Sequence, residues 1–405
     1  MQCQEVAWKH LPRNKMADEF TEVTSESWFS RLGGAVKGIF FGLILFAVSF
    51  VVLFWNEGRA VERQKDLEEG GSKVVSVTAE QVDSGNEGQL IHLSAQASTD
   101  EELKDPVFGV AAKALKLRRS VEMYQWEESV QSETKKKLGG GTETVSTYSY
   151  SKIWSESIID SSGFKKPEGY QNPKTMARSS ESWQAKKVML GAFILSSSLV
   201  SKINAFEPLA VSEENLPDSL KKSIKVNGGG FYMGEAPGNP RVGDMKITFA
   251  SVKPLEVSVV SQQKGESFVP FKSSNGNSVE LLQTGTYSAE EMFQKAQDDN
   301  KMLTWILRVV GFFLMMIGLN MIFKLASVVA DVIPILGNIV GAGTGIIAFL
   351  LAACLSLVTI AIAWVFYRPI LGVALLAVAV ALIVVISMKL KGNKEAVNQA
   401  SAEEA

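Results

Sequence analysis

The chain of 405 residues has very few of the side chains on which much enzyme and metal chemistry depends, namely two cysteines and two histidines. Cys3 is near the N-terminus and Cys354 lies in an apolar run, which excludes a disulfide framework or a Cys-based zinc site in the middle of the chain. His10 is also near the N-terminus, so His92 is the one histidine of the central part. The central part therefore has too few histidines for an HExxH peptidase motif, and a charge-relay triad could use only His92. No cofactor or metal is expected.

Charged residues are almost missing from one long part of the chain. Residues 56–303 hold 30 of the 41 Lys and Arg and 34 of the 43 Asp and Glu, whereas residues 304–388 hold only Arg308, Lys324, Asp331 and Arg368. This contrast predicts a water-exposed domain followed by a membrane domain. The formal net charge of −2 argues against a nucleic-acid binder that relies on bulk electrostatics.

Four apolar stretches predict transmembrane helices, since about 20 apolar residues cross a hydrocarbon layer. They are residues 33–55, Met302–Phe323, Gly345–Tyr367 and Ile370–Met388. Pro334 and several glycines interrupt the run between the second and third stretches, so Leu325–Thr344 is expected to be an interfacial or re-entrant segment. Arg308 is close enough to the end of its stretch to reach the interface.

The predicted fold class is an α+β membrane protein, with one N-terminal and three C-terminal transmembrane helices around a large β-rich domain. The expected parts are a flexible N-terminal tail (1–32), the first helix (33–55), the β-rich domain (56–303), a three-helix membrane domain (304–388) and a C-terminal tail (389–405). The positive-inside rule favours cytosolic termini. The expected location is a bacterial inner membrane with a periplasmic domain, or the endoplasmic reticulum or inner nuclear membrane with a luminal domain.

Alternating polar and apolar residues predict that the central domain is mostly antiparallel sheet. The expected strands are Val74–Val77, Gln89–Ala95, Leu117–Val130, Thr142–Trp154, Met245–Val252, Glu256–Gln262 and Ser267–Pro270. The third and fourth form a long hairpin around a Lys- and Gly-rich tip. A helix is expected from Glu57 to a C-cap at Gly70-Gly71, another over Phe193–Ile203, and a third after the capping box of Ser288 and Glu291.

Two sets of glycines recur with a spacing of four residues. The first set is Gly34, Gly38 and Gly42, and the second is Gly337, Gly341 and Gly345. This spacing places small residues on one helix face, where two backbones can approach closely in lipid. The faces predict either self-association or packing among the helices of one chain, and the second alternative is favoured.

The polar candidates for chemistry are few. His92 alternates with Leu90 and Ser94 on one strand face and is interpreted as a hydrogen-bonded structural residue. A basic cluster is formed by Lys113, Lys116, Arg118 and Arg119 and is followed by Glu122, Tyr124 and Trp126. It fits either phospholipid headgroups or, with more weight, a solvated strand surface.

Several segments together resemble the transmembrane protein 43 family, also called LUMA. They include Asn56-Glu57-Gly58-Arg59, Asn86-Glu87-Gly88, Asp105-Pro106, Lys116-Leu117-Arg118-Arg119, Val121-Glu122-Met123-Tyr124-Gln125-Trp126, Asn172-Pro173, Val242-Gly243-Asp244, Ser288-Ala289-Glu290-Glu291 and Phe366-Tyr367-Arg368-Pro369. The resemblance implies a four-span protein with a luminal or periplasmic domain and no established catalytic residues. For eukaryotic members it implies self-association, lamin and emerin complexes and nuclear envelope organisation, with a role near lipid metabolism.

The leading hypothesis is a non-enzymatic membrane scaffold that self-associates and organises a membrane or a membrane-protein complex. Its expected partners are membrane lipids, further copies of the chain and other membrane proteins, without nucleic acid. The alternative is a lipid- or envelope-modifying enzyme, whose only candidate polar residues are His92, Arg118, Arg119, Glu122 and Tyr124. A transporter ranks third, because the two last predicted spans lack ionisable residues.

Overall fold

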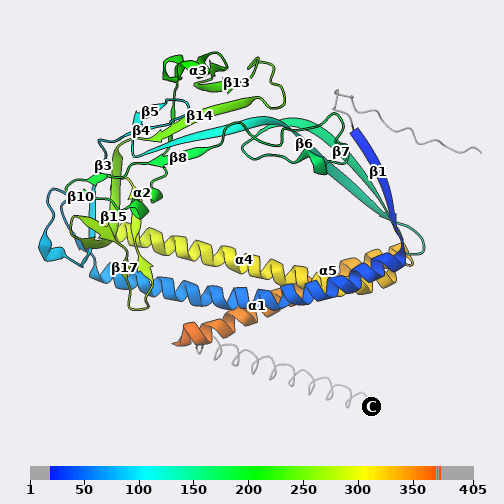
Figure 1. Ribbon diagram of the computed structural model, residues 1–405. Coiled ribbons are helices and arrows are strands. Elements are labelled where there is room, and N and C mark those ends of the chain that lie inside the picture. The colour runs from blue at the N-terminus through cyan, green and yellow to red at the C-terminus, as the bar shows by residue number, and fades with distance from the viewer. Residues whose placement is uncertain (1–18, 371, 373, 375–405) are drawn as a thin grey trace, which may run out of the picture.

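The computed structural model describes residues 19–370, 372 and 374 as an α+β protein with a β-rich middle (Figure 1). Within these residues, three helices are long and apolar enough to cross a membrane: α1 (Trp28–Lys73), α4 (Ala289–Ala330) and α5 (Pro334–Tyr367). The predicted fold class is confirmed for these helices and for the β-rich middle. The predicted fourth helix, Ile370–Met388, falls almost entirely outside the described residues.

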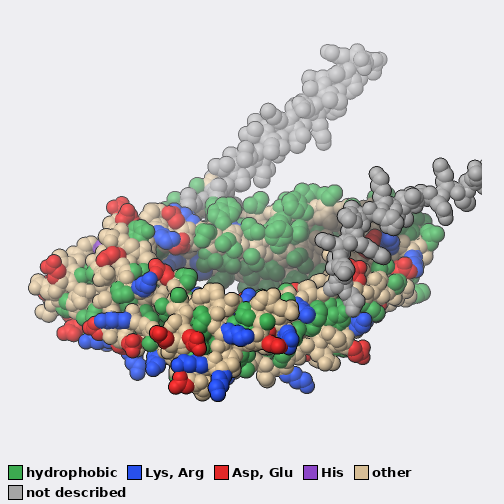
Figure 2. Space-filling view, turned by 90° about the horizontal axis from the view of Figure 1, so that it is seen from above, with side chains coloured by type: hydrophobic (Ala, Val, Ile, Leu, Met, Phe, Trp, Pro, Cys, Tyr) green, Lys and Arg blue, Asp and Glu red, His purple; other side chains and the backbone are tan. Residues whose placement is uncertain are grey.

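The three helices carry large apolar side chains on their outer surfaces. Examples are Phe40, Phe41, Ile44 and Val51 on α1, Ile306, Val309 and Phe313 on α4, and Ile339, Ile346, Phe349 and Leu357 on α5. The space-filling view shows this apolar surface over the helices and charged side chains over the β-rich part (Figure 2). Such a surface is stable in hydrocarbon and not in water.

Helices α1 and α4 are longer than a membrane requires, because both continue into the β-rich part. A helix of 46 residues is about 69 Å long at about 1.5 Å per residue, against a hydrocarbon thickness of about 30 Å. The far ends of the two helices are buried there: Leu67 of α1 and Met292 and Phe293 of α4 form one core cluster with Leu90 and Val260.

Two boundaries differ from the sequence predictions. Helix α1 runs through Gly70-Gly71 to Lys73, because the ring of Phe293 packs on these glycines, and a Cβ on Gly70 would lie 2.9 Å from it. Helix α4 extends to Ala330 and α5 begins at Pro334, so Leu325–Thr344 is not a separate interfacial segment. Proline is well tolerated in the first turn of a helix, where its missing N–H has no partner to lose.

The β-rich part contains two main sheets. In the described residues the first has eight strands: β1 (Glu19–Glu26), β7 (Thr142–Ser155), β6 (Lys116–Lys136), β14 (Met245–Val252), β13 (Gly230–Met233) and β12 (Ile224–Asn227) in this order, with β11 (Glu207–Leu209) on β14 and β8 (Glu181–Gln184) on β6. Its neighbours are antiparallel. The predicted long hairpin is thus confirmed as β6 and β7.

The second sheet has seven strands among the described residues: β19 (Leu281–Thr284), β15 (Leu255–Lys264), β16 (Ser267–Val269), β10 (Phe193–Ile194), β9 (Met189–Leu190), β3 (Leu90–Ser98) and β2 (Val75–Ser76), and β15 also pairs with β3. Two short pairs join β4 (Glu102–Lys104) to β5 (Ala111–Lys113) and β17 (Phe271–Lys272) to β18 (Ser278–Val279). The helix expected over Phe193–Ile203 is shorter, because β10 precedes α2 (Ser197–Lys202); α3 (Asp218–Lys221) is a single turn.

The core lies between the two sheets. Alternate residues of β6 and β14, such as Val121 and Ile247, face alternate residues of β3 and β15, such as Leu93 and Val259, and all four are fully or almost fully buried. Phe108, Phe231 and Phe249 pack ring against ring at one end of this core. The alternation that predicted the strands is therefore the pattern that builds the core.

The outer halves of β6 and β7 leave this core as a β-arm, defined as residues 127–136 and 142–150 together with β1. The β-arm arches along the helices and meets them again at the start of α1 and the end of α4 (Figure 1). There Lys136 contacts Asp331 at 2.6 Å, Gly139 N donates to Val332 O, and Arg31 bonds both Gly140 O and Asp331. Residues 19–32, assigned to a flexible tail by the sequence pattern, instead contain β1 and the first turn of α1.

The pairing of β1 with β7 is testable in membranes. Val23 and Val145 are directly opposed, so cysteines at these two positions should form a disulfide under mild oxidation when Cys3 and Cys354 are replaced by serine. Cysteines at Val23 and Ser146 are the matched control, because a shift of one residue points the side chains to opposite faces. Equal crosslinking of both pairs, or of neither, would show that β1 does not pair with β7 in the membrane-bound protein.

Candidate functional site

The densest polar site lies where the apolar helices enter the β-rich part. Glu57 of α1 is fully buried there and receives three hydrogen bonds. Arg308 of α4 donates to it through Nε at 2.6 Å and Nη2 at 2.9 Å, and Trp364 of α5 donates through Nε1 at 2.7 Å. One carboxylate therefore joins all three long helices, and a two-pronged Arg–carboxylate pair fixes their relative rotation.

A second group of bonds joins α1 to α4 beside Glu57. Arg59 donates to Asn300 Oδ1 at 2.9 Å and to Thr304 Oγ1 at 3.0 Å. Asn56 donates to Thr304 O at 3.0 Å, and Asn300 donates to Ala60 O at 2.9 Å. Helix backbones seldom offer spare hydrogen-bonding groups in an apolar setting, so these side chains specify one register between the two helices.

Glycine allows the helices to approach at two further points. A Cβ on Gly311 of α4 would lie 2.5 Å from Leu53, and a Cβ on Gly58 would lie 2.6 Å from the ring of Tyr367. The Asn56-Glu57-Gly58-Arg59 motif thus supplies a buried acid, three side-chain hydrogen bonds to α4 and one close contact with Tyr367, all at the helix junction. We call Asn56, Glu57, Arg59, Asn300, Thr304, Arg308 and Trp364 the junction cluster.

A cavity of about 330 Å³ opens beside the junction cluster. Its lining includes Gln64 of α1, Lys301, Trp305 and Arg308 of α4, Trp364 of α5, and Arg368 directly after α5. Three of these side chains are cationic, and no carboxylate belongs to the described lining. Arg308 lies between the two indoles, with its guanidinium carbon 4.8 Å from the ring centre of Trp305 and 5.7 Å from that of Trp364.

Next to this cavity, a second one of about 510 Å³ has a mixed lining. It includes Arg59 and Arg63 together with Glu62, Asp66 and Asp299. Asp66 is buried and accepts hydrogen bonds from Ser273, Asn275 and Asn277, which fasten the loop between β17 and β18 to α1. The acidic residues here are thus partly committed to holding this loop.

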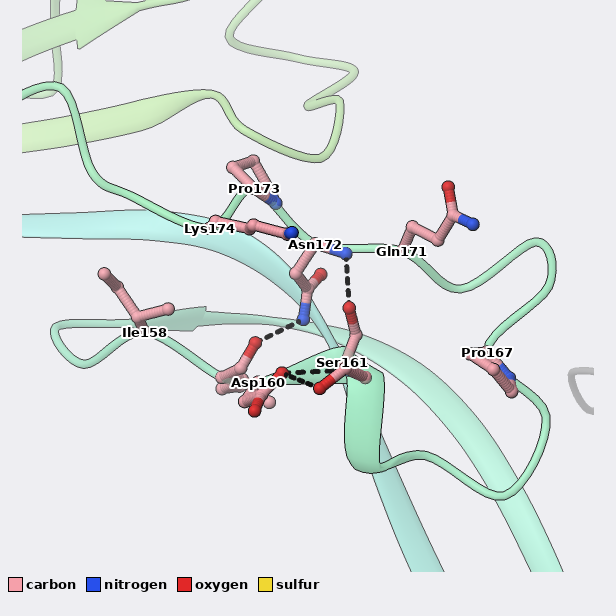
Figure 3. A pocket seen from close by; sticks show the side chains of 10 residues that line it. Ile158, Asp160, Ser161, Pro167, Gln171, Asn172, Pro173 and Lys174 are labelled. Atoms are coloured by element: carbon pink, nitrogen blue, oxygen red, sulfur yellow. Dashed lines mark hydrogen bonds between the residues drawn. The ribbon is translucent and has the colours of Figure 1, made fainter.

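A larger hollow of about 850 Å³ lies in the loops after β7, and its polar groups mainly bond one another (Figure 3). Asn172 N donates to Ser161 Oγ at 2.8 Å, and Asn172 Nδ2 donates to Ile159 O and to Trp126 O. The side-chain Oδ1 of Asn172 in turn accepts from Trp126 N at 2.7 Å. The Asn172-Pro173 motif therefore pins a loop to β6, a structural task.

His92 also has a structural environment. It is buried in β3, with Nε2 donating to Tyr287 O at 2.9 Å, so that Nδ1 accepts from the Ser76 hydroxyl at 3.2 Å. Burial lowers the pKa of His92 below its usual value of 6.5, and the bond to Tyr287 opposes this effect in part. The neutral ring joins β2, β3 and the turn before α4.

The other candidates for an enzyme site lie on β6 in the first sheet. Arg119 is buried and pairs with Asp105 at 2.5 Å and Glu181 at 3.0 Å, while Arg118 stacks on the ring of Phe206 at 4.3 Å. Glu122 is opposite Lys246 on β14, and Tyr124 packs against Trp154. Since His92 belongs to the second sheet, the structure does not bring these five side chains together as one site.

Metal binding has no support from the described residues, where no three His, Cys, Asp or Glu side chains are grouped. The glycine faces divide into two kinds. A Cβ on Gly42 would meet Gly318 O at 2.7 Å, one on Gly337 would meet Asp331, and one on Gly341 would lie 3.0 Å from Ser327. A Cβ on Gly345 would lie 3.9 Å from Asn320 Oδ1, whereas a Cβ on Gly34 or Gly38 would meet nothing within 4 Å.

The sequence did not predict the pairing of Glu57 with Arg308, because Arg308 was expected to extend alone to the membrane interface. The available signal was a lone cation in one apolar stretch and a lone acid at the end of another. Charged side chains inside apolar helices generally form ion pairs with one another. Which acid pairs with which cation depends on packing, however, and no local pattern contains it.

An apolar helix before a β-rich unit and two after it, clamped where they enter that unit, define an integral membrane protein with a large insertion between its first two membrane helices. Residues 123–369 match the family described as Transmembrane protein 43. The chain belongs to this family. It is 37% identical to human Transmembrane protein 43 over 370 residues, covering 87% of this chain and 92% of the human protein.

Further relatives cover similar lengths. Rat Transmembrane protein 43 is 35% identical over 390 residues, with 93% of this chain and 96% of the relative covered. The Transmembrane protein 43 homolog of Drosophila melanogaster is 32% identical over 347 residues, with 83% and 90% covered. No solved structure matches the chain.

Breaking the Glu57–Arg308 pair should destabilise the fold. Replacing Glu57 with Gln leaves the guanidinium of Arg308, whose side chain is only 17% exposed, without a charge partner, which costs about 3 kcal/mol. The exposed Glu62 on the same helix is the matched control, and its replacement with Gln should cost less than about 0.5 kcal/mol. Adding Arg308→Met to Glu57→Gln should recover part of the loss. Equal stability of Glu57→Gln and the parent in denaturation in micelles would refute the role of the pair.

The neutral state of His92 predicts an acid-sensitive contribution to stability. Below pH 6.5, the pKa of His92 in the unfolded chain, the unfolded chain binds a proton at His92 more readily than the folded chain does. The free energy of unfolding therefore falls as the pH drops towards the lower pKa of the folded state. His92→Asn removes this contribution. The midpoint temperature of thermal unfolding, measured from about pH 7 to about pH 5, should therefore fall less steeply for the variant than for the parent. Parallel curves for both proteins would contradict this assignment.

Proposed function

We propose that the protein is a membrane-embedded scaffold, which holds its β-rich unit in a fixed position relative to the bilayer for binding other membrane components. The observation that carries this proposal is the continuity of α1 and α4. Both helices pass from the apolar part into the β-rich core without a linker, and Leu67, Met292 and Phe293 are buried at that end. A unit held by two continuous helices cannot swing freely, unlike one on a flexible tether.

The rigid junction supports the proposal further. The junction cluster fixes the three helices at the point of entry, and Asp331 joins the far end of the bundle to Arg31 and Lys136. The β-rich unit is therefore attached to the helices at both ends of the bundle. A scaffold requires such a defined geometry between its membrane part and its binding surface.

Self-association is the finer part of the proposal. Gly42 and Gly337 pack within the chain, but Gly34 and Gly38 present a surface with no neighbour within 4 Å. Small residues on a helix face let a second helix approach closely in lipid. Further copies of the chain, other membrane proteins and lipids are the proposed partners. The proposed location is an endoplasmic reticulum or inner nuclear membrane, or a bacterial inner membrane.

The open glycine face gives a direct test of self-association. Gly38→Leu should leave the fold intact and lower the crosslinked dimer fraction in membranes, since an interhelical contact of about 1 kcal/mol corresponds to a change of up to tenfold in the association constant. Gly343→Leu on α5 is the matched control, because a Cβ there also meets nothing within 4 Å. Gly42→Leu should instead destabilise the single chain. An unchanged dimer fraction in Gly38→Leu would exclude this face from assembly.

A further inference from the structure

The cavity of about 330 Å³ beside the junction cluster contains a cation whose charge the protein does not balance. Arg308 is neutralised by Glu57, and Lys301 contacts Asp298 at 2.9 Å on the exposed side of α4. Arg368, half-buried after the last turn of α5, donates from its side chain to the uncharged Gln64 Oε1 at 3.1 Å. No ion pair to Arg368 occurs among the described residues. A half-buried guanidinium without a carboxylate favours an anionic ligand.

The remaining donors point to an oxyanion with several acceptor atoms. Arg308 uses Nε and Nη2 on Glu57, which leaves Nη1 without a partner among the described residues. Arg368 uses Nη2 for its bond to Gln64. A guanidinium presents its donors in a fixed plane that matches carboxylate and phosphate oxygens, and a phosphate can accept from more than one such group.

The surroundings place this cavity at a bilayer surface. Trp305 is 64% exposed and flanks the cavity, and the neighbouring Met302 and Ile306 expose apolar side chains. Tryptophan is enriched at the level of lipid headgroups, where one side of the ring is apolar and the other is wet. An apolar groove of about 540 Å³ also lies on α1 and α5, lined by Phe50, Phe54, Leu355 and Ile362 among others. Tyr367, which also lines this groove, directly precedes Arg368 of the cationic cavity in the chain.

We propose that this cavity binds the phosphate group of an anionic phospholipid, with Arg368 as the charged contact and Arg308 as the positioned donor between the two indoles. A volume of about 330 Å³ is at the small end of ligand sites, which suits a headgroup phosphate. Free phosphate shares this chemistry, but the interfacial setting favours the lipid. The site goes beyond the scaffold function and does not depend on self-association.

The experiment uses the full chain in an uncharged detergent. Its affinity is measured for three probes: dioctanoyl phosphatidic acid, dioctanoyl phosphatidylcholine and inorganic phosphate. We expect phosphatidic acid to bind most tightly. Equal affinities for phosphatidic acid and phosphatidylcholine would overturn the anionic headgroup, and inorganic phosphate that competes with equal affinity would overturn the lipid as ligand.

Variants then test the residues. Arg368→Gln should weaken phosphatidic acid binding about tenfold, the effect of one charge-assisted hydrogen bond. Arg368→Lys keeps the charge and should bind with intermediate affinity, which separates a lost contact from a lost fold. Lys295→Gln is the matched control, because Lys295 is an exposed cation on α4 outside the cavity lining. Unchanged binding by Arg368→Gln, or an equal loss in Lys295→Gln, would refute the site.

Discussion

The carboxylate of Glu57 is the constraint on which the membrane part of this structure depends. It is fully buried among apolar helices, where an unpaired charge would cost several kcal/mol. Arg308 of α4 donates two hydrogen bonds to this carboxylate, and Trp364 of α5 donates a third. The helices must therefore meet at this point and in this rotation. Close packing elsewhere follows: Gly42 and Gly318 face each other, and Leu53 lies on Gly311. These contacts supply dispersion energy, but in lipid they would not by themselves select one arrangement.

The β-arm places a second constraint on the bilayer. Strand β6 has 21 residues and is about 69 Å long at about 3.3 Å per residue, which equals the length of α1. The β-arm carries the charged side chains Glu127, Glu128, Glu133, Lys135, Lys136 and Glu143. Such a surface does not enter hydrocarbon, so lipid tails contact the helices only on faces that the β-arm leaves free. If α1 crosses the bilayer in this arrangement, the β-arm lies at the level of the hydrocarbon layer, and polar groups rather than lipid tails must surround it.

Local patterns predicted most of the elements but few of their relations. Alternation over Leu117–Val130 and Thr142–Trp154 identified the hairpin, because half of each strand faces the core. Apolar runs identified three helices, since lipid tolerates no other exposed surface. The failures occurred where packing overrides local preference: Gly70-Gly71 continues a helix under Phe293, and Pro334 begins one rather than breaking it. The junction cluster joins positions about 250 residues apart, and a single sequence carries no signal for such a pairing.

Charge balance separates the structural from the ligand-binding part of the junction. Two arginines, Arg308 and Arg368, lie beside the same cavity, but the buried acid Glu57 already accepts hydrogen bonds from Arg308 and Trp364. A second buried carboxylate for Arg368 would have completed a closed network with no remaining affinity for anions. Instead, Arg368 contacts the neutral Gln64 at the edge of the apolar surface. The cost of a partly buried, uncompensated cation is reduced when an anion from the bilayer surface supplies the missing charge, so the pair that holds the helices together also determines which arginine remains available to lipid.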